Sequence, residues 1–348
     1  MKICFFGIYD PAYSRNEILL SGLRQNRVEV IECREDWRDP KRYRKLWRKL
    51  RMLDNDYDYV YAVYPSSVPA IMAKFISKRP VIVDAFYSNF DSVVNDRRKY
   101  SRFDPRAVKM LIFDWLGVIF SDLVITDTNT HAKYWRKWWG MKNKKFGTVY
   151  VGVDDGQIHP GPIVKKDYTL IHFHGYFIPL QGTCRIIEAA RLLVADSHIR
   201  FRLIGHGRDL PKAKKLAEEY DLKNVEFIDS VPFGRLSDYL TEADIVLGIF
   251  GDNDKTQRVI PNKLYEGLAA KRAVISMDTR AVREIFTDKD LLLVKNDAQS
   301  IANGILTLIG NEKLRADLSG NGYETVLRYT PPHIGKAFRD IIVNVFQS

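Results

Sequence analysis

Short apolar runs that alternate with helix-period segments are the feature that most constrains the fold of this chain. Six such runs, rich in Val, Ile, Phe and Tyr, begin before residue 154, and six more begin after residue 167. Strands that are buried on both faces read as continuous apolar runs, and the helices between them cover the sheet. The pattern therefore predicts an α/β fold built on parallel sheets. The runs begin at Lys2, Val28, Asp58, Pro80, Leu123 and Thr148, and then at Tyr168, Ile199, Val225, Ile245, Ala273 and Leu291.

The interruption between the two sets of runs predicts a domain boundary. Residues 154–167 contain two prolines and two glycines and show little periodicity, as a linker does. A chain of 348 residues is long for one core and suits two domains of ordinary size. We expect two doubly wound domains, residues 1–154 and 155–330, that face a central cleft. A helix over residues 331–348 is expected to pack back on the first domain.

The composition is that of a soluble globular protein, with 46% hydrophobic and 28% charged residues. The most apolar stretch, residues 111–126, is interrupted by Asp114 and Asp122, so we expect no membrane-spanning segment there. The apolar run at the N-terminus reaches Asp10 too soon for a signal peptide. Three cysteines in apolar segments suit reduced thiols, and we expect a cytoplasmic protein. The cysteines are Cys4, Cys33 and Cys184.

Positive charge is concentrated in the first half of the chain. Residues 1–150 hold 28 Lys and Arg against 17 Asp and Glu, whereas residues 151–348 hold 26 of each kind. Much of the excess lies in Arg38–Arg51, where eight basic residues share a predicted helix with apolar residues at spacings of three and four. Such a helix could lie on anionic lipid, or it could pack on the sheet with a solvated charged face. A second basic and aromatic cluster, Arg136–Lys145, favours a peripheral position on the cytoplasmic face of a membrane.

The informative loops of the second half follow its strands. Residues 171–182, 203–209, 230–240 and 250–263 each begin in or directly after a predicted strand, so they meet at one sheet edge. Glycines in the first loop let the backbone approach an anion closely. The loops therefore predict a ligand site at the carboxyl edge of the second sheet.

The last of these loops enters a helix whose start favours an anion. Pro261 is typical of a first helical position, because that amide would have no intrahelical partner. Asn262 and Lys263 then lie in the first turn, where free amides, the helix dipole and the lysine together favour phosphate. Glu266 follows within one further turn and either compensates the dipole or contacts a ligand. A nucleoside diphosphate site is the interpretation that accounts for these residues together.

Four segments of the second half resemble, in order and spacing, the second domain of retaining glycosyltransferases with two Rossmann-like domains, the GT-B fold and glycosyltransferase family 4 (glycosyl transferases group 1). These segments are HGYFIPLQG, LIGHG, SVPFGRLSDYLTEADIVLGIFG and VIPNKLYEGLAAKRAVISMDTRAVRE, and the resemblance covers most of the chain. It implies that the helix start meets the diphosphate, that Glu266 binds the ribose hydroxyls, and that no metal or other cofactor is needed. The other donor-binding residues that it implies are Asn262, Gly175, Tyr176, Gln181, Gly205, Val231, Ile260 and Pro261.

The chain departs from the family pattern at three positions near the diphosphate. Arg258 stands where the family commonly has a glutamate, eight positions before the ribose carboxylate. Tyr176 and Gln181 stand where the family has an arginine and a lysine. We therefore expect that Lys255, Arg258 and Lys263 supply the missing charge from the opposite loop, and that Arg258 and Lys263 act as catalytic residues.

In the first domain the acceptor loop of the family corresponds to residues 7–17, which begin with Gly7 and Asp10 but lack a glycine pair. Tyr87 and Ser88 follow another strand and are expected to contact the acceptor as well. Asp84 lies where family members often have a catalytic-site histidine, and it either orients a hydroxyl or is a buried, hydrogen-bonded aspartate.

His172 and His174 face the same side of a predicted strand as an H-x-H pair. Because no third ligand accompanies them, we expect histidines of the core or of a loop rather than a metal site.

The sequence thus predicts a glycosyltransferase that moves a sugar from a nucleoside diphosphate sugar, with retention of configuration, to a glycan or a lipid-linked acceptor. Its role would lie in the biosynthesis of a polysaccharide or a glycolipid. A sugar-nucleotide epimerase of the same fold is an alternative, although it would leave the basic amphipathic segment poorly explained. A basic nucleic-acid-binding protein is another, but no recognised single-strand or duplex motif appears, so we expect no nucleic-acid partner.

Overall fold

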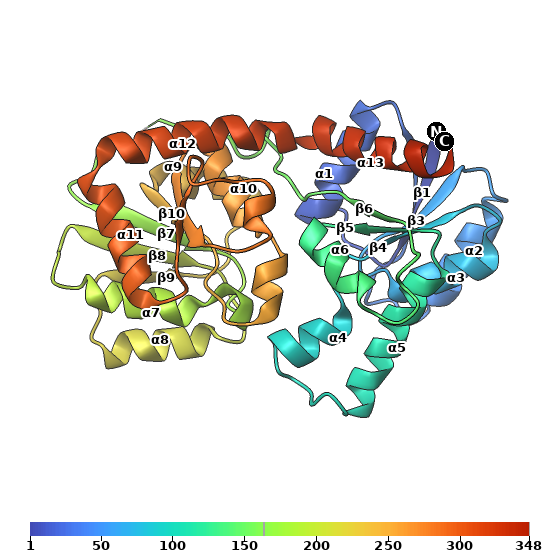
Figure 1. Cartoon of the computed structure of the whole chain (residues 1–348), viewed down its shortest axis with the longest axis horizontal. Helices are drawn as coiled ribbons and strands as arrows, with labels where there is room; N and C mark the ends of the chain where they lie inside the picture. The colour runs from blue at the N-terminus through green and yellow to red at the C-terminus, as the bar shows by residue number, and fades with distance from the viewer. Residues whose placement is uncertain (163, 348) are drawn as a thin grey trace. The chain divides into compact units, whose positions relative to one another are not determined.

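The computed structural model describes residues 1–162 and 164–347 (Figure 1). The chain divides into unit 1, which comprises Met1–Gly152 and Tyr329–Ser348, and unit 2, which comprises Val153–Arg328. The division after Gly152 falls two residues before the boundary expected from the sequence. The C-terminal segment belongs with the first unit, to which its apolar side chains are packed.

Unit 1 is built on a parallel sheet of six strands in the order β2-β1-β3-β4-β5-β6. The central strands carry β-branched and aromatic residues that are buried on both faces, as a covered parallel sheet requires. Its strands are β1 (Lys2–Gly7), β2 (Glu29–Arg34), β3 (Tyr59–Ala62), β4 (Val81–Asp84), β5 (Leu123–Thr126) and β6 (Phe146–Thr148).

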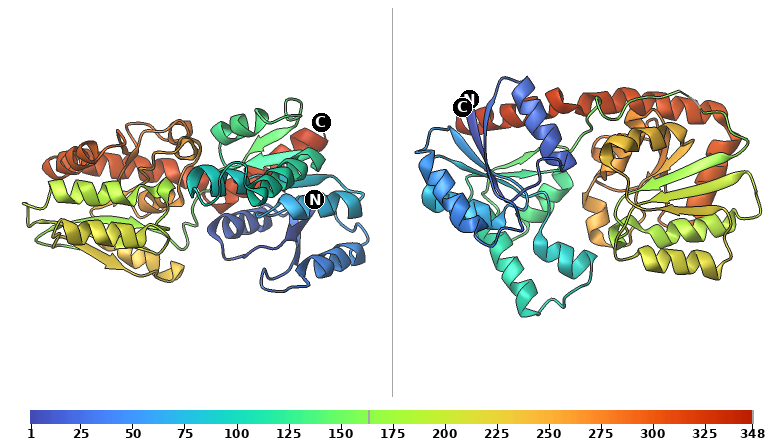
Figure 2. Two further views of the ribbon diagram at one scale, coloured as in Figure 1. Left: turned by 90° about the horizontal axis from the view of Figure 1, so that it is seen from below. Right: turned by 180° about the vertical axis from the view of Figure 1, so that it is seen from behind.

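Two apolar cores cover the two faces of this sheet. One contains side chains of α1 (Ser14–Gln25) and α13 (Pro331–Phe346), which lie side by side in Figure 2. A Cβ at Gly22 would lie only 1.9 Å from the carbonyl oxygen of Pro331, so this close approach requires glycine. The other core contains side chains of the helices that cover the opposite face. These helices are α2 (Arg42–Met52), α3 (Ser67–Ile76), α5 (Pro105–Phe120) and α6 (Asn129–Arg136).

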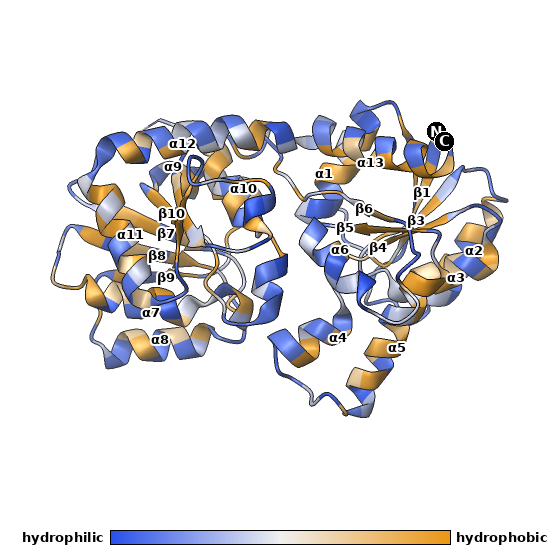
Figure 3. Cartoon of the chain, viewed as in Figure 1, coloured by the Kyte–Doolittle hydropathy of each residue, from blue (hydrophilic) through white to orange (hydrophobic). Residues whose placement is uncertain are grey.

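Unit 2 contains a second parallel sheet of six strands, in the order β12-β11-β10-β7-β8-β9. One face packs against α7, α8 and α11 in a single apolar core, and α9, α10 and α12 complete the unit. Figure 3 shows the apolar residues gathered along the strands of both units. The strands are β7 (Thr169–His174), β8 (Ile199–Ile204), β9 (Val225–Ile228), β10 (Ile245–Leu247), β11 (Ala273–Met277) and β12 (Leu292–Val294). The helices are α7 (Thr183–Leu192), α8 (Leu210–Glu219), α9 (Phe233–Glu242), α10 (Asn262–Ala269), α11 (Ala298–Gly310) and α12 (Glu312–Val326).

The predicted α/β fold with two parallel sheets is confirmed, and each of the twelve apolar runs contributes to a strand. The largest shift is at β6, which was expected over residues 148–153 but ends at Thr148. Thr148 pairs with Thr126, the last residue of β5, so the ladder ends where its partner strand ends. No helix in the described part of the chain is both long and apolar enough to cross a membrane.

Candidate active site

The first two loops of unit 2 touch at the carboxyl ends of β7 and β8. Gly175 and Gly205 follow these strands with φ angles of +131° and +137°, which L residues with a side chain rarely adopt. A Cβ at Gly205 would lie 2.0 Å from the carbonyl oxygen of Gly175, so both the conformation and the contact require glycine. The backbone at this edge is therefore open to close approach by a ligand.

The helix start that was predicted to bind an anion forms the first turn of α10. Pro261 is extended and directly precedes the first helical residue, so it lies one position earlier than the sequence predicted. Ile260, before it, is buried, and Asn262 is partly exposed. The positions of Ile260 and Asn262 are both compatible with a ligand at the free amides of the first turn.

Lys263 is buried, and its ammonium lies against the loop that follows β7. Its Nζ donates a hydrogen bond to Oε1 of Gln181 and lies 4.0 Å from the centroid of the Phe173 ring. A Cβ at Gly175 would lie 3.2 Å from the same Nζ. The ammonium of Lys263 therefore contacts Gln181. Gln181 stands where the family that the sequence resembles has a lysine.

Burial lowers the pKa of Lys263 to about 7, although the Glu266 carboxylate acts in the opposite direction. Gln181 is a neutral amide, so its hydrogen bond does not supply a compensating negative charge. An anion placed beside Lys263 would favour the charged form of its amine.

Glu266 lies on the same helix and is also buried. Its Oε2 is 2.7 Å from Nε2 of His174, and Nδ1 of His174 is 3.1 Å from Nε2 of His172. The H-x-H pair is thus connected to the carboxylate that was expected to bind ribose. Sequence analysis missed this connection, and the only signal for it was that both histidines face the same side of one strand.

Arg258, the third expected charged residue, lies in a 3-10 turn, Asp254–Arg258, before α10. Its guanidinium is buried and donates to Asp254, which is largely exposed. Asp254 therefore offsets part of the positive charge that the sequence assigned to the diphosphate.

The remaining predicted donor residues lie on the loops after β7 and β9. Tyr176 is 59% exposed, and its ring lies edge-on to His206 at a centroid distance of 4.7 Å. His206 in turn contacts the hydroxyl of Ser230, the neighbour of the half-buried Val231. Three of the four predicted loops are thus linked at one edge.

Arg185, which the sequence analysis did not select, holds the fourth loop. From the first turn of α7, its Nη1 donates to the carbonyl oxygen of Phe250 at 2.7 Å and to Oδ1 of Asn296 at 3.0 Å. The sequence signal that could have indicated Arg185 is its position three residues after Gly182, at the start of a predicted helix. Arg185 positions the loop that leads to Arg258 and Lys263.

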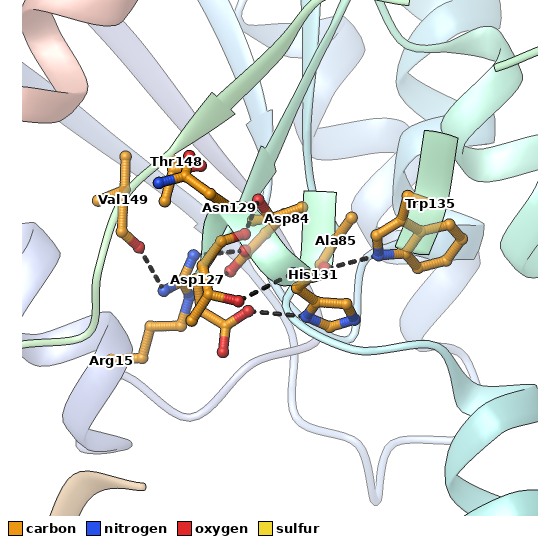
Figure 4. Close-up of polar contacts among 11 residues, drawn as sticks. Arg15, Asp84, Ala85, Asp127, Asn129, His131, Trp135, Thr148 and Val149 are labelled. Carbon is orange, nitrogen blue, oxygen red and sulfur yellow. Dashed lines mark hydrogen bonds and ion pairs between the residues drawn. The ribbon is translucent and has the colours of Figure 1, made fainter. Parts of the chain in front are cut away.

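In unit 1, Asp84 ends the central strand β4 and is fully buried (Figure 4). Its Oδ2 and Oδ1 accept hydrogen bonds of 3.0 and 2.8 Å from Nε and Nη2 of Arg15, which also donates to the carbonyl oxygen of Val149. Both carboxylate oxygens are engaged by one guanidinium. This geometry favours the buried, hydrogen-bonded aspartate, which is one of the two roles that the sequence left open for Asp84.

A second buried pair lies beside it. Oδ1 of Asp127 is 2.7 Å from Nδ1 of His131, on the first turn of α6 (Figure 4). The indole of Trp135 donates to the carbonyl oxygen of Ala85 at 3.1 Å, so α6 is tied to the loop after β4.

Ser88 was expected to contact the acceptor, but its side chain is buried and occupied. Its hydroxyl donates to Asp114 at 2.8 Å and accepts from the amide of Asp91 at 3.0 Å. Burial raises the pKa of Asp114, although several hydrogen bonds act in the opposite direction. Ser88 therefore caps a short helical turn, Asn89–Asp91, and its hydrogen bonds favour a structural role.

Tyr87 belongs to an aromatic cluster at the carboxyl edge of the unit 1 sheet. Its ring is 4.3 Å from that of Tyr64, and Phe86 lies within 6.1 Å of Tyr87 and 6.3 Å of Tyr13. Burial raises the pKa of Tyr87 to about 12, so its hydroxyl stays protonated at neutral pH. The aromatic cluster, defined as Tyr13, Tyr64, Phe86 and Tyr87, is partly exposed to solvent.

The two remaining acceptor candidates lie in the loop after β1. Gly7 is buried, and a Cβ there would lie 3.2 Å from the carbonyl oxygen of Val63. Asp10 is exposed, and its Oδ1 accepts a hydrogen bond from the amide of Ala12. Gly7 thus shapes the strand end, whereas Asp10 lies in the solvent-facing turn.

Within residues 1–162 and 164–347, no group of three or more His, Cys, Asp or Glu side chains is placed to hold a metal ion.

Comparison with known proteins shows which proteins this chain is similar to. Residues 155–325 match the family described as glycosyl transferases group 1. Two uncharacterized glycosyltransferases of Methanocaldococcus jannaschii are 27% and 26% identical over 193 and 154 residues, which are 53% and 43% of this chain. The matched regions span 49% and 38% of those relatives, about half of their length or less.

Solved structures share the fold over nearly the whole chain. Anabaena Alr3699/HepE in complex with UDP and glucose has a TM-score of 0.77 at 15% identity, covering 99% of this chain and 100% of that one. The sucrose-phosphate synthase of Thermosynechococcus elongatus has the same TM-score and identity and covers 99% of both chains. The likeness to these structures shows the GT-B fold, with two Rossmann-like domains.

Proposed function

We propose that this chain is a family 4 hexosyltransferase that moves a sugar from a nucleoside diphosphate sugar to a hydroxyl acceptor with retention of configuration. The observation that carries the proposal is the first two turns of α10, which place a buried ammonium and a buried carboxylate beside the loop after β7. The match over residues 155–325 covers this part of the chain. The complexes of Alr3699/HepE with UDP and with UDP-glucose support a donor of this class.

The chemistry of the donor site rests on charge rather than on a dedicated metal. Lys263, Arg258 and the free amides at the start of α10 would stabilise the negative charge that develops on the departing diphosphate. A diphosphate oxygen would then take the proton of the acceptor hydroxyl on the face that the leaving group occupies. Attack from that face accounts for retention.

The aromatic cluster of unit 1 is the proposed surface for the acceptor. Its rings lie after the carboxyl ends of β1, β3 and β4, where open α/β sheets bind ligands. Aromatic faces pack against the apolar faces of sugar rings, and the Tyr hydroxyls add hydrogen-bonding groups. We therefore propose a glycan or a lipid-linked sugar as the acceptor, in the biosynthesis of a polysaccharide or a glycolipid.

The basic helix of unit 1 supports a peripheral position on the cytoplasmic face of a membrane. Leu46 and Leu50 of α2 are buried in the core, whereas Trp47 is 39% exposed and Met52 is 83% exposed. A basic aromatic groove lies along this side of the helix. It is lined by Tyr43, Arg44, Trp47, Arg48, Arg51, Met52 and Met72. Arginines around apolar side chains suit the boundary between anionic headgroups and acyl chains.

A thermal-shift screen with UDP-, GDP-, ADP- and dTDP-sugars tests the donor proposal. A ligand that binds the native state raises the unfolding temperature as its concentration exceeds Kd. Glu266→Ala should keep the fold but lower the affinity for the selected donor about tenfold to a hundredfold, because bonds to a charged group are worth about 1.5 to 3 kcal/mol. A wild-type protein that responds to none of these donors would reject the proposal.

A further inference from the structure

A line of buried polar side chains runs through unit 2 to Glu266. His172 and Arg202 are opposite each other in the register of β7 and β8, and His174 lies two residues further along β7 on the same face. His172 is fully buried, and Arg202 is 5% exposed. The alternate residues Ile171 and Phe173 point into the apolar core on the other face. The polar face is therefore specific to this part of the sheet.

The direction of each hydrogen bond follows from the arginine. Nε of Arg202 always carries a proton, and it donates to Nδ1 of His172 at 3.4 Å. His172 then carries its proton on Nε2 and donates it to Nδ1 of His174 at 3.1 Å. His174 in turn carries its proton on Nε2 and donates it to Oε2 of Glu266 at 2.7 Å. The relay runs in one direction, from Arg202 through His172 and His174 to Glu266.

The charge states agree with this order. Burial, followed by the fields of the cationic Arg202 and Lys263, lowers the pKa of His172 well below its usual value. A neutral His172 has one donor and one acceptor nitrogen, as a relay of this direction requires.

The far end of the relay is anchored on α9. Nη2 of Arg202 donates to the carbonyl oxygen of Tyr239 at 2.6 Å, and Nη1 donates to the carboxylate of Glu242. Three hydrogen bonds thus fix the guanidinium and, through it, the tautomer of His172. Buried polar groups of this kind are costly unless they are paired, and an apolar layer would cover the sheet at lower cost. A function at the end of the relay accounts for its presence.

We propose that His174, oriented by His172 and Arg202, is a positioning residue that fixes the Glu266 carboxylate for pairing with the 2′ and 3′ hydroxyls of the donor ribose. This inference rests on the donor site of the proposed function. A carboxylate has about four lone-pair positions, so the bond from His174 leaves acceptor capacity for a diol. A carboxylate held in one orientation loses less entropy when the nucleotide binds. The relay therefore sets the preference for a ribonucleotide.

The test compares substitutions that keep or break the last hydrogen bond. The amide of His174→Gln can accept from His172 and still reach Glu266, whereas the shorter amide of His174→Asn reaches only the position of Nδ1. His174→Leu removes both bonds. His198→Leu is the matched control, because His198 is an exposed histidine of the same unit. Calorimetry first measures binding of UDP, GDP, ADP and CDP to the wild type, and then of the 2′,3′-dideoxy form of the tightest ligand.

We expect the wild type to prefer the ribonucleotide about tenfold or more. His174→Asn and His174→Leu should each lose about tenfold for the ribonucleotide and nothing for the dideoxy form. His174→Gln should stay within about threefold of the wild type, and His198→Leu should not change. If His174→Leu fails to fold, the comparison of His174→Gln with His174→Asn still tests the inference.

Four other outcomes would overturn the inference, and they separate its failure from that of the donor site. Equal losses for both ligands would make His174 a structural residue only. Unchanged affinity in His174→Asn would remove any positioning role. A wild type that binds none of the four diphosphates, or that binds ribonucleotide and dideoxy forms equally, would reject the ribose assignment of Glu266 itself, and the relay would then have no ribose to position.

Discussion

The two units hold their buried charged side chains in different ways, as Asp84 of β4 and the charged residues of α10 show. In unit 1, Asp84 meets the guanidinium of Arg15 in a two-bonded ion pair, and the charge is neutralised within the fold. In unit 2, Lys263 contacts a neutral amide and Glu266 contacts an imidazole. Arg15 neutralises the charge of Asp84, whereas the hydrogen-bond partners of Lys263 and Glu266 carry no opposite charge. The contrast supports a structural role for Asp84 and Arg15 and agrees with the donor role that we propose for Lys263 and Glu266.

The largest expected effect tests the structural half of this contrast. Arg15→Ala would leave the Asp84 carboxylate buried without its cation, and breaking a buried pair in this way costs about 3 to 5 kcal/mol in the free energy of unfolding. Nucleotide affinity should persist in the fraction that remains folded. Urea unfolding and calorimetry at low temperature measure the two quantities.

The matched control for this prediction is Arg106→Ala. Arg106 and Asp104 form a comparable ion pair, but Arg106 is exposed to solvent, so its removal should have little effect. If Arg15→Ala were as mild as the control while donor turnover collapsed, Asp84 and Arg15 would belong to the catalytic site after all.

The second effect concerns the donor half. Lys263→Gln should lower turnover about a hundredfold and donor affinity less, because the charge on the leaving diphosphate is greatest in the transition state. Arg258→Ala should cost less, since Asp254 already offsets part of its charge. Adding Gln181→Lys to Lys263→Gln should restore part of the turnover, because the two side chains are in contact. Steady-state kinetics of the single and double variants measure this. A double variant whose turnover is no higher than that of Lys263→Gln would contradict the expectation that Lys263 supplies the charge missing at Gln181.

The sequence predicts a feature well when its residues are close together along the chain, and poorly when they are far apart. The strands follow from local apolar runs, and the anion-binding helix start follows from Pro261 and its neighbours. The bonds between Arg15 and Asp84 and between His174 and Glu266 join positions 69 and 92 residues apart. Such pairs depend on the register of strands and on where a helix crosses the sheet, which no local pattern specifies. The sequence alone therefore leaves Asp84 open between two roles and does not indicate Arg15 as its partner.

The third prediction concerns pH and the donor site. Because the pKa of Lys263 is about 7 and a diphosphate favours its charged form, donor affinity should be greatest below pH 7 and fall as the pH rises above it, by at most tenfold per unit. A nucleotide sugar is the suitable probe, since its phosphates lack the second ionisation near pH 6 that a terminal phosphate has. Calorimetry from pH 6 to 9 should show this fall in the wild type and a flat profile in Lys263→Gln.

The lowered pKa of Lys263 has the opposite effect on the stability of the protein without a ligand, which rises with pH. The lysine keeps its proton up to about pH 10.5 when unfolded but loses it near pH 7 when folded. The unfolded state therefore binds more protons in this window, and the contribution of Lys263 to the free energy of unfolding rises with pH. Stability that rises less in Lys263→Gln over this window would agree with the assignment, whereas an identical rise would contradict it.

The smallest effect tests whether the basic aromatic groove of unit 1 contacts a membrane while unit 2 does not. An arginine near an anionic surface contributes about 1 kcal/mol, so Arg48→Ala should weaken binding to anionic vesicles about fivefold. Lys215→Ala, on the exposed side of α8 in unit 2, is the control and should leave binding unchanged. Co-sedimentation should decline as salt rises, because the attraction is screened over about 10 Å at 0.1 M. Pelleting that is equal with neutral vesicles and insensitive to salt would argue against the surface, and tighter binding to an oligonucleotide would assign the positive charge of unit 1 to nucleic acid instead.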